Sequence, residues 1–249
     1  MNRAQGGTHS PTGGLLGLAE SAWQFVKRHR WSLPLASLAS VSFAQLGSEM
    51  REGEVAAFDA AVFEVVEGWR GHLDAPLLFL TQIGGVTGMA AVTAACVVVL
   101  LLVRRRREAA FLLIAAGGAL LINTLLKLIF HRARPQALEY LINLPPSFSF
   151  PSGHAMASMA VFTSLLVVLH TLNAPRWAQY AALVLTAVIA PGVALSRVYF
   201  GVHYPSDVIG GQLAAAAWVS AITGWFHPHL LPGEHAATAV DKGDAATDS

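Results

Sequence analysis

The sequence predicts an all-α fold: a bundle of six transmembrane helices with both termini in the cytoplasm and an active site at the extracytoplasmic face. Composition is the first reason, because 54% of the 249 residues are hydrophobic and 12% are charged, whereas soluble domains carry about 25% charged residues. Continuity is the second reason. The apolar runs reach the length of about 20 residues that crosses a bilayer as a helix, and they do not alternate as the strands of a membrane barrel do.

The helices are expected in chain order, each over one apolar run. The first is the weakest, because it is short and rich in serine, and the second covers the longest run. Pro191 and Gly192 predict a kink in the fifth helix, which lipid tolerates when neighbouring groups satisfy the freed carbonyl. The expected ranges are 31–48, 78–103, 109–130, 153–172, 177–197 and 207–226.

Polar segments flank and interrupt this membrane domain, which is expected over 31–226. The cytoplasmic tails 1–30 and 227–249 are rich in small, polar and charged residues. Between the first two spans, 51–74 mixes acids with apolar residues at helical spacing, as expected of a helix lying at the membrane interface. A cleavable leader ending near Ala44 is the less favoured interpretation of the N-terminal part, because such a leader would be long.

Orientation follows from the cations, since Lys and Arg in short loops remain on the cytoplasmic side. The run Arg104 to Arg107 between the second and third helices therefore predicts a cytoplasmic loop, and with it two cytoplasmic termini. Six other cations are then sent to the outer face, where the rule would exclude them. They are Arg51, Arg70, Lys127, Arg132, Arg134 and Arg197, and four of the six need another explanation.

Composition also argues against several kinds of site. A net charge of +1 gives no broad basic field, so nucleic acid is not an expected partner. The single cysteine, Cys96, lies in an apolar run and is expected to serve packing. Acidic residues on the expected outer face are scattered, so we expect no metal site and no cofactor.

Three clusters of ionisable residues stand at helix ends that the topology sends to one face. Charges at membrane depth are costly, so they usually pair with one another or line a polar site. The clusters are Lys127 to Arg134 with Pro135, then Pro151-Ser152-Gly153-His154, and then Ser196-Arg197 followed by His203 and Asp207.

The chemistry of these clusters suits a phosphate group. Ser152 and Gly153 open an apolar helix, and such an N-terminus can hold an anion, although an ordinary helix cap is the simpler interpretation of that pair. His203 and Asp207 are four residues apart, so the carboxylate can accept one ring proton and leave the other nitrogen free as a nucleophile or base. His154 could supply the matching acid. Fixed positive charge suited to a dianion comes from Lys127, Arg134 and Arg197.

In this order and spacing, the three clusters resemble the motifs of the type 2 phosphatidic acid phosphatase superfamily, which also contains vanadium haloperoxidases. The resemblance covers about 59–225, and the apolar spans are similar to the integral-membrane lipid phosphatase branch. It implies that His203 forms a phosphohistidine, that Asp207 orients His203, and that His154 protonates the leaving oxygen. It also implies a phosphate site made by Lys127, Arg134, Ser152, Gly153 and Arg197. His131 and Arg132 are not motif positions and are expected to face lipid headgroups.

The expected function is therefore a metal-independent phosphatase of the bacterial inner membrane, with its site facing the periplasm or exterior. Its substrate would be a membrane lipid phosphate or diphosphate, such as phosphatidate, phosphatidylglycerol phosphate or undecaprenyl diphosphate. A lipid phosphotransferase on the same site is an open alternative. A transporter of anionic lipids is disfavoured, because it leaves the acid, nucleophile and orienting carboxylate unexplained. The sequence selects neither the lipid nor an oligomeric state.

Overall fold

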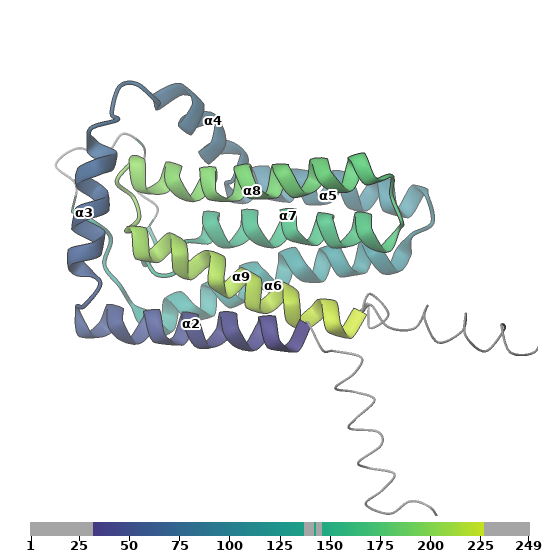
Figure 1. Ribbon diagram of the computed structural model, residues 1–249, viewed down its shortest axis with the longest axis horizontal. Coiled ribbons are helices and arrows are strands. Elements are labelled where there is room, and N and C mark those ends of the chain that lie inside the picture. The colour runs from purple at the N-terminus through teal and green to yellow at the C-terminus, as the bar shows by residue number, and fades with distance from the viewer. Residues whose placement is uncertain (1–31, 137–141, 143–145, 227–249) are drawn as a thin grey trace, which may run out of the picture. The chain divides into compact units, whose positions relative to one another are not determined.

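The computed structural model describes residues 32–136, 142 and 146–226, and every regular element in these ranges is an α-helix. The predicted tails 1–30 and 227–249 lie outside the described residues. The helices are α2 (Ser32–Glu52), α3 (Ala56–Glu67), α4 (Asp74–Ile83), α5 (Val86–Leu102), α6 (Arg106–Phe130), α7 (Gly153–Thr171), α8 (Arg176–Tyr199) and α9 (Pro205–Phe226) (Figure 1).

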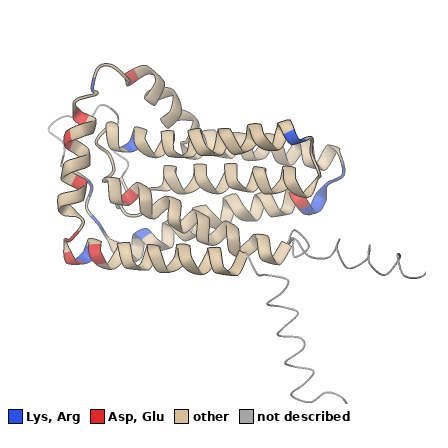
Figure 2. Cartoon of the chain, in the orientation of Figure 1, with Lys and Arg blue, Asp and Glu red and all other residues tan. Residues whose placement is uncertain are grey.

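Four of these helices, α6, α7, α8 and α9, are long and apolar enough to cross a membrane. The bent pair α4 and α5 would make a fifth span if it is counted as one. Charged residues lie mostly near the helix ends and leave the middle of the bundle apolar (Figure 2). The predicted all-α fold is confirmed for the described residues, with four or five candidate spans where the sequence predicted six. The first predicted span, now α2, is not among the candidates, because serines and the charges at its C-terminal end lower its hydropathy.

The continuous helix predicted over 78–103 is instead broken between α4 and α5, with a bend of 56°. Gly84 and Gly85 make the break. A Cβ atom added to Gly84 would lie 2.2 Å from Cγ1 of Val193, so the glycine allows α4 to pack directly on α8. The break escapes sequence analysis because the apolar run continues through it and glycine is common in membrane helices.

Helix α7 lies at the centre of the bundle and contacts α5, α6, α8 and α9. Its start is held against α9 by close backbone approach: a Cβ atom at Gly211 would come within 2.5 Å of the Ser152 carbonyl oxygen. The backbone N–H of Ser152 also donates to the Asp207 carbonyl oxygen at 2.9 Å. Small residues permit such approach in membrane bundles. Two of the predicted clusters are therefore joined by the backbone itself.

The ends of α6 and α8 meet the starts of α7 and α9 at one end of the bundle, and α3 crosses this end (Figure 1). Helix α3 falls within the stretch 51–74 that the sequence predicted to be helical. The arginine run that begins at Arg104 stands at the opposite end of α6, a helix of 25 residues and therefore about 37 Å long. The bundle thus separates this run from the end where the three clusters meet.

Candidate active site

A cavity of about 440 Å³ opens among the residues of the three clusters. Its polar end is lined by Lys127 and Arg134 from the end of α6 and the following segment, by Gly153 and His154 from the start of α7, and by His203 from the turn before α9. Ser147, in the segment before α7, completes this lining. Segments separated by up to 76 positions in the chain therefore face one volume.

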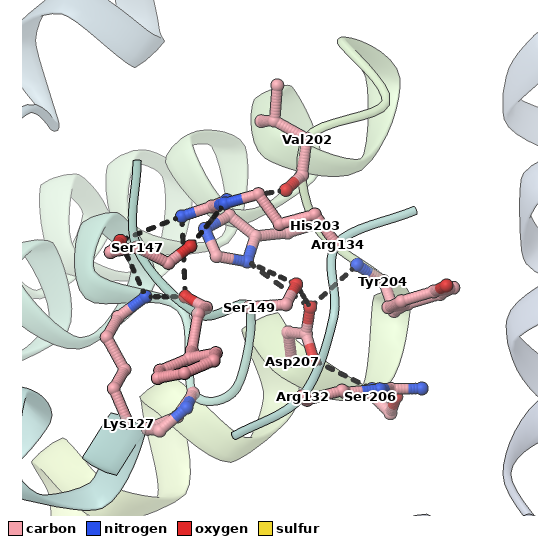
Figure 3. Close-up of polar contacts among 12 residues, drawn as sticks. Lys127, Arg132, Arg134, Ser147, Ser149, Val202, His203, Tyr204, Ser206 and Asp207 are labelled. Carbon is pink, nitrogen blue, oxygen red and sulfur yellow. Dashed lines mark hydrogen bonds and ion pairs between the residues drawn. The ribbon is translucent and has the colours of Figure 1, made fainter. Parts of the chain in front are cut away.

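His203 and Asp207 form the hydrogen-bonded pair that their spacing predicts (Figure 3). Nδ1 of His203 lies 3.2 Å from Oδ2 of Asp207, and both side chains are buried. A carboxylate accepts, so the proton belongs on Nδ1 and Nε2 is left with its lone pair. Oδ2 of Asp207 also accepts from the Tyr204 backbone N–H at 2.9 Å, the reach-back bond of a capping box. The first turn of α9 thus fixes the carboxylate that orients the imidazole.

Arg134 holds the other side of the imidazole. Its Nη1 lies 3.1 Å from Nε2 of His203 and donates to the Val202 carbonyl oxygen at 2.7 Å. Its Nε donates to the carbonyl oxygen of Ser147 at 2.8 Å. The Lys127 ammonium donates to the Phe148 carbonyl oxygen. Backbone carbonyls therefore position both cations at the polar end of the cavity, with Arg134 beside the ring nitrogen that carries the lone pair.

The Ser152-Gly153 pair caps α7 in an unusual way. Ser152 is fully buried, and its Oγ has no hydrogen-bond partner. Across the turn, the Asn123 amide donates to the Pro151 carbonyl oxygen at 3.1 Å, and a Cβ atom at Gly153 would lie 3.0 Å from Oδ1 of Asn123. The turn is tied to α6 without any help from the serine hydroxyl, which leaves that hydroxyl available.

Arg197 is 3% exposed and lies in the wall of the site, outside the cavity lining. Its Nη1 donates to Oγ1 of Thr81 at 2.7 Å, while its Nε has no partner. The Arg197 carbonyl oxygen also accepts from the backbone N–H of His203 at 3.3 Å. Arg197 thus connects α4 to the turn that presents His203.

All eight predicted site residues lie at this end of the bundle. Five of them line the cavity, and Ser152, Arg197 and Asp207 stand directly behind it. The interpretation of Arg132 as a headgroup-facing residue is wrong: its side chain is 14% exposed, and it forms ion pairs with Asp59 and Asp207. Arg132 lies within the first cluster of the sequence, but its partners could not be recognised there, because the two acids lie 73 and 75 positions away.

Burial and charge together lower the pKa of His203. Burial acts most strongly, because it disfavours the imidazolium, while Asp207 raises the pKa and the nearby charges of Arg134 and Arg197 lower it. The net direction keeps the ring neutral, which is the form with a nucleophilic nitrogen. In the described ranges, no three His, Cys, Asp or Glu side chains gather as metal ligands would.

Residues 108–230 match the family model described as "PAP2 superfamily". The chain is 38% identical over 103 residues to a decaprenylphosphoryl-5-phosphoribose phosphatase of Mycobacterium tuberculosis, an alignment covering 41% of this chain and 51% of that protein. It is 38% identical over 93 residues to phosphatidylglycerophosphatase B of Bacillus subtilis (strain 168), covering 36% of this chain and 44% of that protein. It therefore spans about half the length of these curated relatives.

A solved structure also shares the fold. The crystal structure of a transmembrane PAP2-type phosphatidylglycerolphosphate phosphatase from Bacillus subtilis matches with a TM-score of 0.69, at 24% identity, over 77% of this chain and 95% of that one. The apolar helices and this transmembrane neighbour agree that the chain is an integral membrane protein.

Proposed function

We propose that the protein is a metal-independent lipid phosphatase of the PAP2 superfamily, whose family model matches residues 108–230. In this proposal it hydrolyses the terminal phosphate of a lipid phosphate or diphosphate through a phosphohistidine. The observation that carries it is the single cavity that Lys127, Arg134, His154 and His203 line together. Two histidines, one oriented by a carboxylate, beside fixed cations match the requirements of phosphoryl transfer.

In the first step, Nε2 of His203 attacks phosphorus and the bond from phosphorus to the leaving oxygen breaks. His154 donates a proton to that oxygen, and Asp207 stabilises the positive charge that develops on the imidazole. Charge on the equatorial oxygens is stabilised by a set of cations and donors. Lys127, Arg134 and the Gly153 backbone N–H supply them from the cavity lining, and Arg197 and the Ser152 hydroxyl supply them from the wall directly behind it.

In the second step, water attacks the phosphohistidine and the phosphorus–nitrogen bond breaks. His154, now neutral, takes the proton of the water, so the acid and base roles alternate and the enzyme returns to its first state. Inorganic phosphate leaves. A lipid alcohol in place of water would make the same step a phosphotransfer.

The apolar part of the cavity supports a lipid substrate. From the polar end it continues between α5, α6 and α7, and along α6 it extends from Lys127 to Leu113, about 20 Å of helix length. We propose that one hydrocarbon chain lies there while the headgroup reaches His203. The apolar lining is formed by Val86, Met89, Ala90, Ala94, Leu113, Ala116, Gly117, Ala119, Leu120, Ala157 and Val161.

We further propose that the site faces the periplasm or exterior of a bacterial inner membrane. The arginine run beginning at Arg104 and the proposed site stand at opposite ends of α6. The four arginines of the run stand together at the start of α6, where Arg107 donates to the Phe226 carbonyl oxygen, and they follow the positive-inside rule. Lys127, Arg134 and Arg197 are held at the proposed site, at the other end of the bundle.

Phosphate release from a panel of lipids tests the proposal. We expect the detergent-purified chain to release phosphate from at least one of phosphatidate, phosphatidylglycerol phosphate and undecaprenyl diphosphate, at a rate unchanged by a chelator. Adding a lipid alcohol and following labelled phosphate distinguishes transfer from hydrolysis. Activity that the chelator abolishes and magnesium restores would contradict the metal-independent mechanism.

The pH profile tests the protonation state of His203. Because its folded pKa is lowered from the ordinary value of about 6.5, the neutral nucleophile persists as the pH falls, and its protonation should limit kcat/KM only below that value. The measurement is kcat/KM against pH, with the ionisation of the substrate followed separately by phosphorus NMR. An enzyme ionisation at or above pH 6.5 that limits the acidic side would contradict this assignment.

Filling the apolar part of the cavity tests the chain-binding groove. Gly117 lines it, and a Cβ atom there would meet no heavy atom within 4 Å, so Gly117→Leu should fold and occupy the space of the substrate chain. We expect kcat/KM to fall about 10-fold or more for a long-chain substrate and to change little for a short-chain analogue. Leu121→Phe, on the exposed face of α6, is the matched control. An equal fall in kcat/KM on the long-chain and short-chain substrates would contradict the proposal that the apolar part of the cavity binds the hydrocarbon chain.

A further inference from the structure

A buried chain of charged side chains lies behind Asp207, on the side away from His203. Nη1 of Arg132 donates to Oδ1 of Asp207 at 2.7 Å, and Nη2 donates to Oδ2 of Asp59 at 2.8 Å. The side chains of the two acids are 0% and 4% exposed, and that of Arg132 is 14% exposed. One guanidinium therefore bridges two carboxylates that come from helices 148 positions apart in the chain.

Asp59 also caps α9 from outside that helix. Its Oδ1 accepts from the backbone N–H of Ser206 at 2.8 Å, and its Oδ2 accepts from the Ser206 hydroxyl at 2.7 Å. Amides in the first turn of a helix have no partner within the helix, and a negative charge is favoured there by the helix dipole. Helix α3 thus supplies the acceptor that the first turn of α9 lacks, one residue before Asp207.

Arg132 is itself held on several sides. Its guanidinium lies 4.0 Å from the centroid of the Tyr204 ring, and Nη1 also donates to the Ser206 hydroxyl at 2.7 Å. Its carbonyl oxygen accepts from the Ser149 backbone N–H at 2.8 Å. The Ser149 hydroxyl in turn donates to Oδ2 of Asp207. Both oxygens of the Asp207 carboxylate are therefore fixed, one by Arg132 and the other by groups that Arg132 helps to place.

Fixing the carboxylate matters for chemistry at His203. Rotation of the Asp207 carboxylate would break its hydrogen bond with Nδ1 of His203. The ring could then adopt the other tautomer, whose Nε2 carries a proton and cannot attack phosphorus. An isolated carboxylate would also stabilise the imidazolium more strongly than one whose charge is offset by a guanidinium.

We propose that Arg132 and Asp59 are positioning residues that hold Asp207, and through it His203, in the geometry needed for attack. This inference rests on the proposed function of the site. Arg132 contacts Asp207 and Asp59 contacts Arg132, on the side of Asp207 away from the cavity, so both act through Asp207. The structure thereby gives α3 a part in the active site as well as a place at the end of the bundle.

Kinetics of two neutralising variants, Arg132→Gln and Asp59→Asn, test the proposal on the full chain in detergent. The substrate is phosphatidate or undecaprenyl diphosphate, whichever the wild-type chain hydrolyses faster. We expect kcat to fall about 10- to 100-fold in each variant, as when partners that orient a ligating histidine are removed, with KM within about threefold because the phosphate-binding cations are untouched. Glu67→Gln, an exposed acid of the same helix α3, is the matched control and should keep the wild-type kcat.

The pH profile separates positioning from general stability, because the two variants carry opposite charge changes. Loss of the Arg132 guanidinium leaves the negative charge of Asp207 less offset, which should raise the pKa of His203 and move the acidic limb of kcat/KM to higher pH. Loss of the Asp59 charge should have the opposite effect. Each shift should be about half a pH unit or more. The double variant should return it toward wild type. The other charged and titratable groups around His203 are the same in every variant: Arg134 after α6, Lys127 in α6, His154 in α7, Arg197 in α8 and Asp207 in α9.

A wild-type chain that releases no phosphate from any lipid of the panel would contradict the proposed function. If the wild type is active but the folded variants keep the wild-type kcat and the acidic limb stays in place, only the positioning role is contradicted. The same conclusion follows if the acidic limb moves in the same direction in both variants. If Arg132→Gln does not fold, Arg132→Lys replaces it. Lysine keeps the charge but cannot bridge both carboxylates, so kcat should fall while the limb stays, and a wild-type kcat would overturn the proposal.

Discussion

Replacing His203 by alanine should lower phosphate release by at least about 10⁴-fold, because the substitution removes the atom that forms the covalent intermediate. The effect should fall on kcat more than on KM, since Lys127 and Arg134 are held by backbone carbonyls that the substitution does not touch. The wild-type chain, stopped with denaturant during turnover, should carry an acid-labile, alkali-stable phosphate, and the variant should carry none.

His170→Ala is the matched control for this experiment. His170 lies on α7 as His154 does, but near the other end of that helix, where its exposed ring contacts Gln179. It should retain the wild-type rate and the phosphoenzyme. A His203→Ala variant that folds and still forms a phosphoenzyme would contradict the assignment of the nucleophile. Retained lipid movement across vesicles without phosphate release in the wild type would favour the transporter alternative instead.

The residues of the site could be found from the sequence because each motif is local. His203 and Asp207 are four positions apart and pair across the turn that opens α9, and Ser152, Gly153 and His154 are adjacent at the start of α7. Topology supplies the remaining step. With alternating helix directions, the end of α6 and the starts of α7 and α9 must lie at one end of the bundle.

Arg132 and Asp59 could not be assigned in this way. Asp59 stands among several acids in an amphipathic stretch, and nothing in its local spacing distinguishes it from Glu64 or Glu67. Its role depends on where α3 crosses the bundle, which is set by tertiary packing. The break at Gly84 and Gly85 is similar, because its cause is the contact with Val193 of α8, more than 100 positions away.

His154→Ala should separate the two classes of substrate. A lipid monophosphate expels an alkoxide, which needs a proton as the bond breaks, so loss of the general acid should cost about 10²- to 10⁴-fold. A lipid diphosphate expels a lipid phosphate, whose oxygen can leave without that proton, so the first step should slow less than about 10-fold.

The two steps must be measured apart, because His154 is also the proposed base for hydrolysis of the phosphohistidine. Release of the dephosphorylated lipid in a single turnover reports the first step, and release of inorganic phosphate reports the second. With undecaprenyl diphosphate, the variant should therefore release its lipid product at near the wild-type rate, then accumulate phosphoenzyme. With phosphatidate it should accumulate none, because the first step is now the slow one. Equal slowing of lipid release on both substrates would show that His154 does not act as the acid for the leaving oxygen.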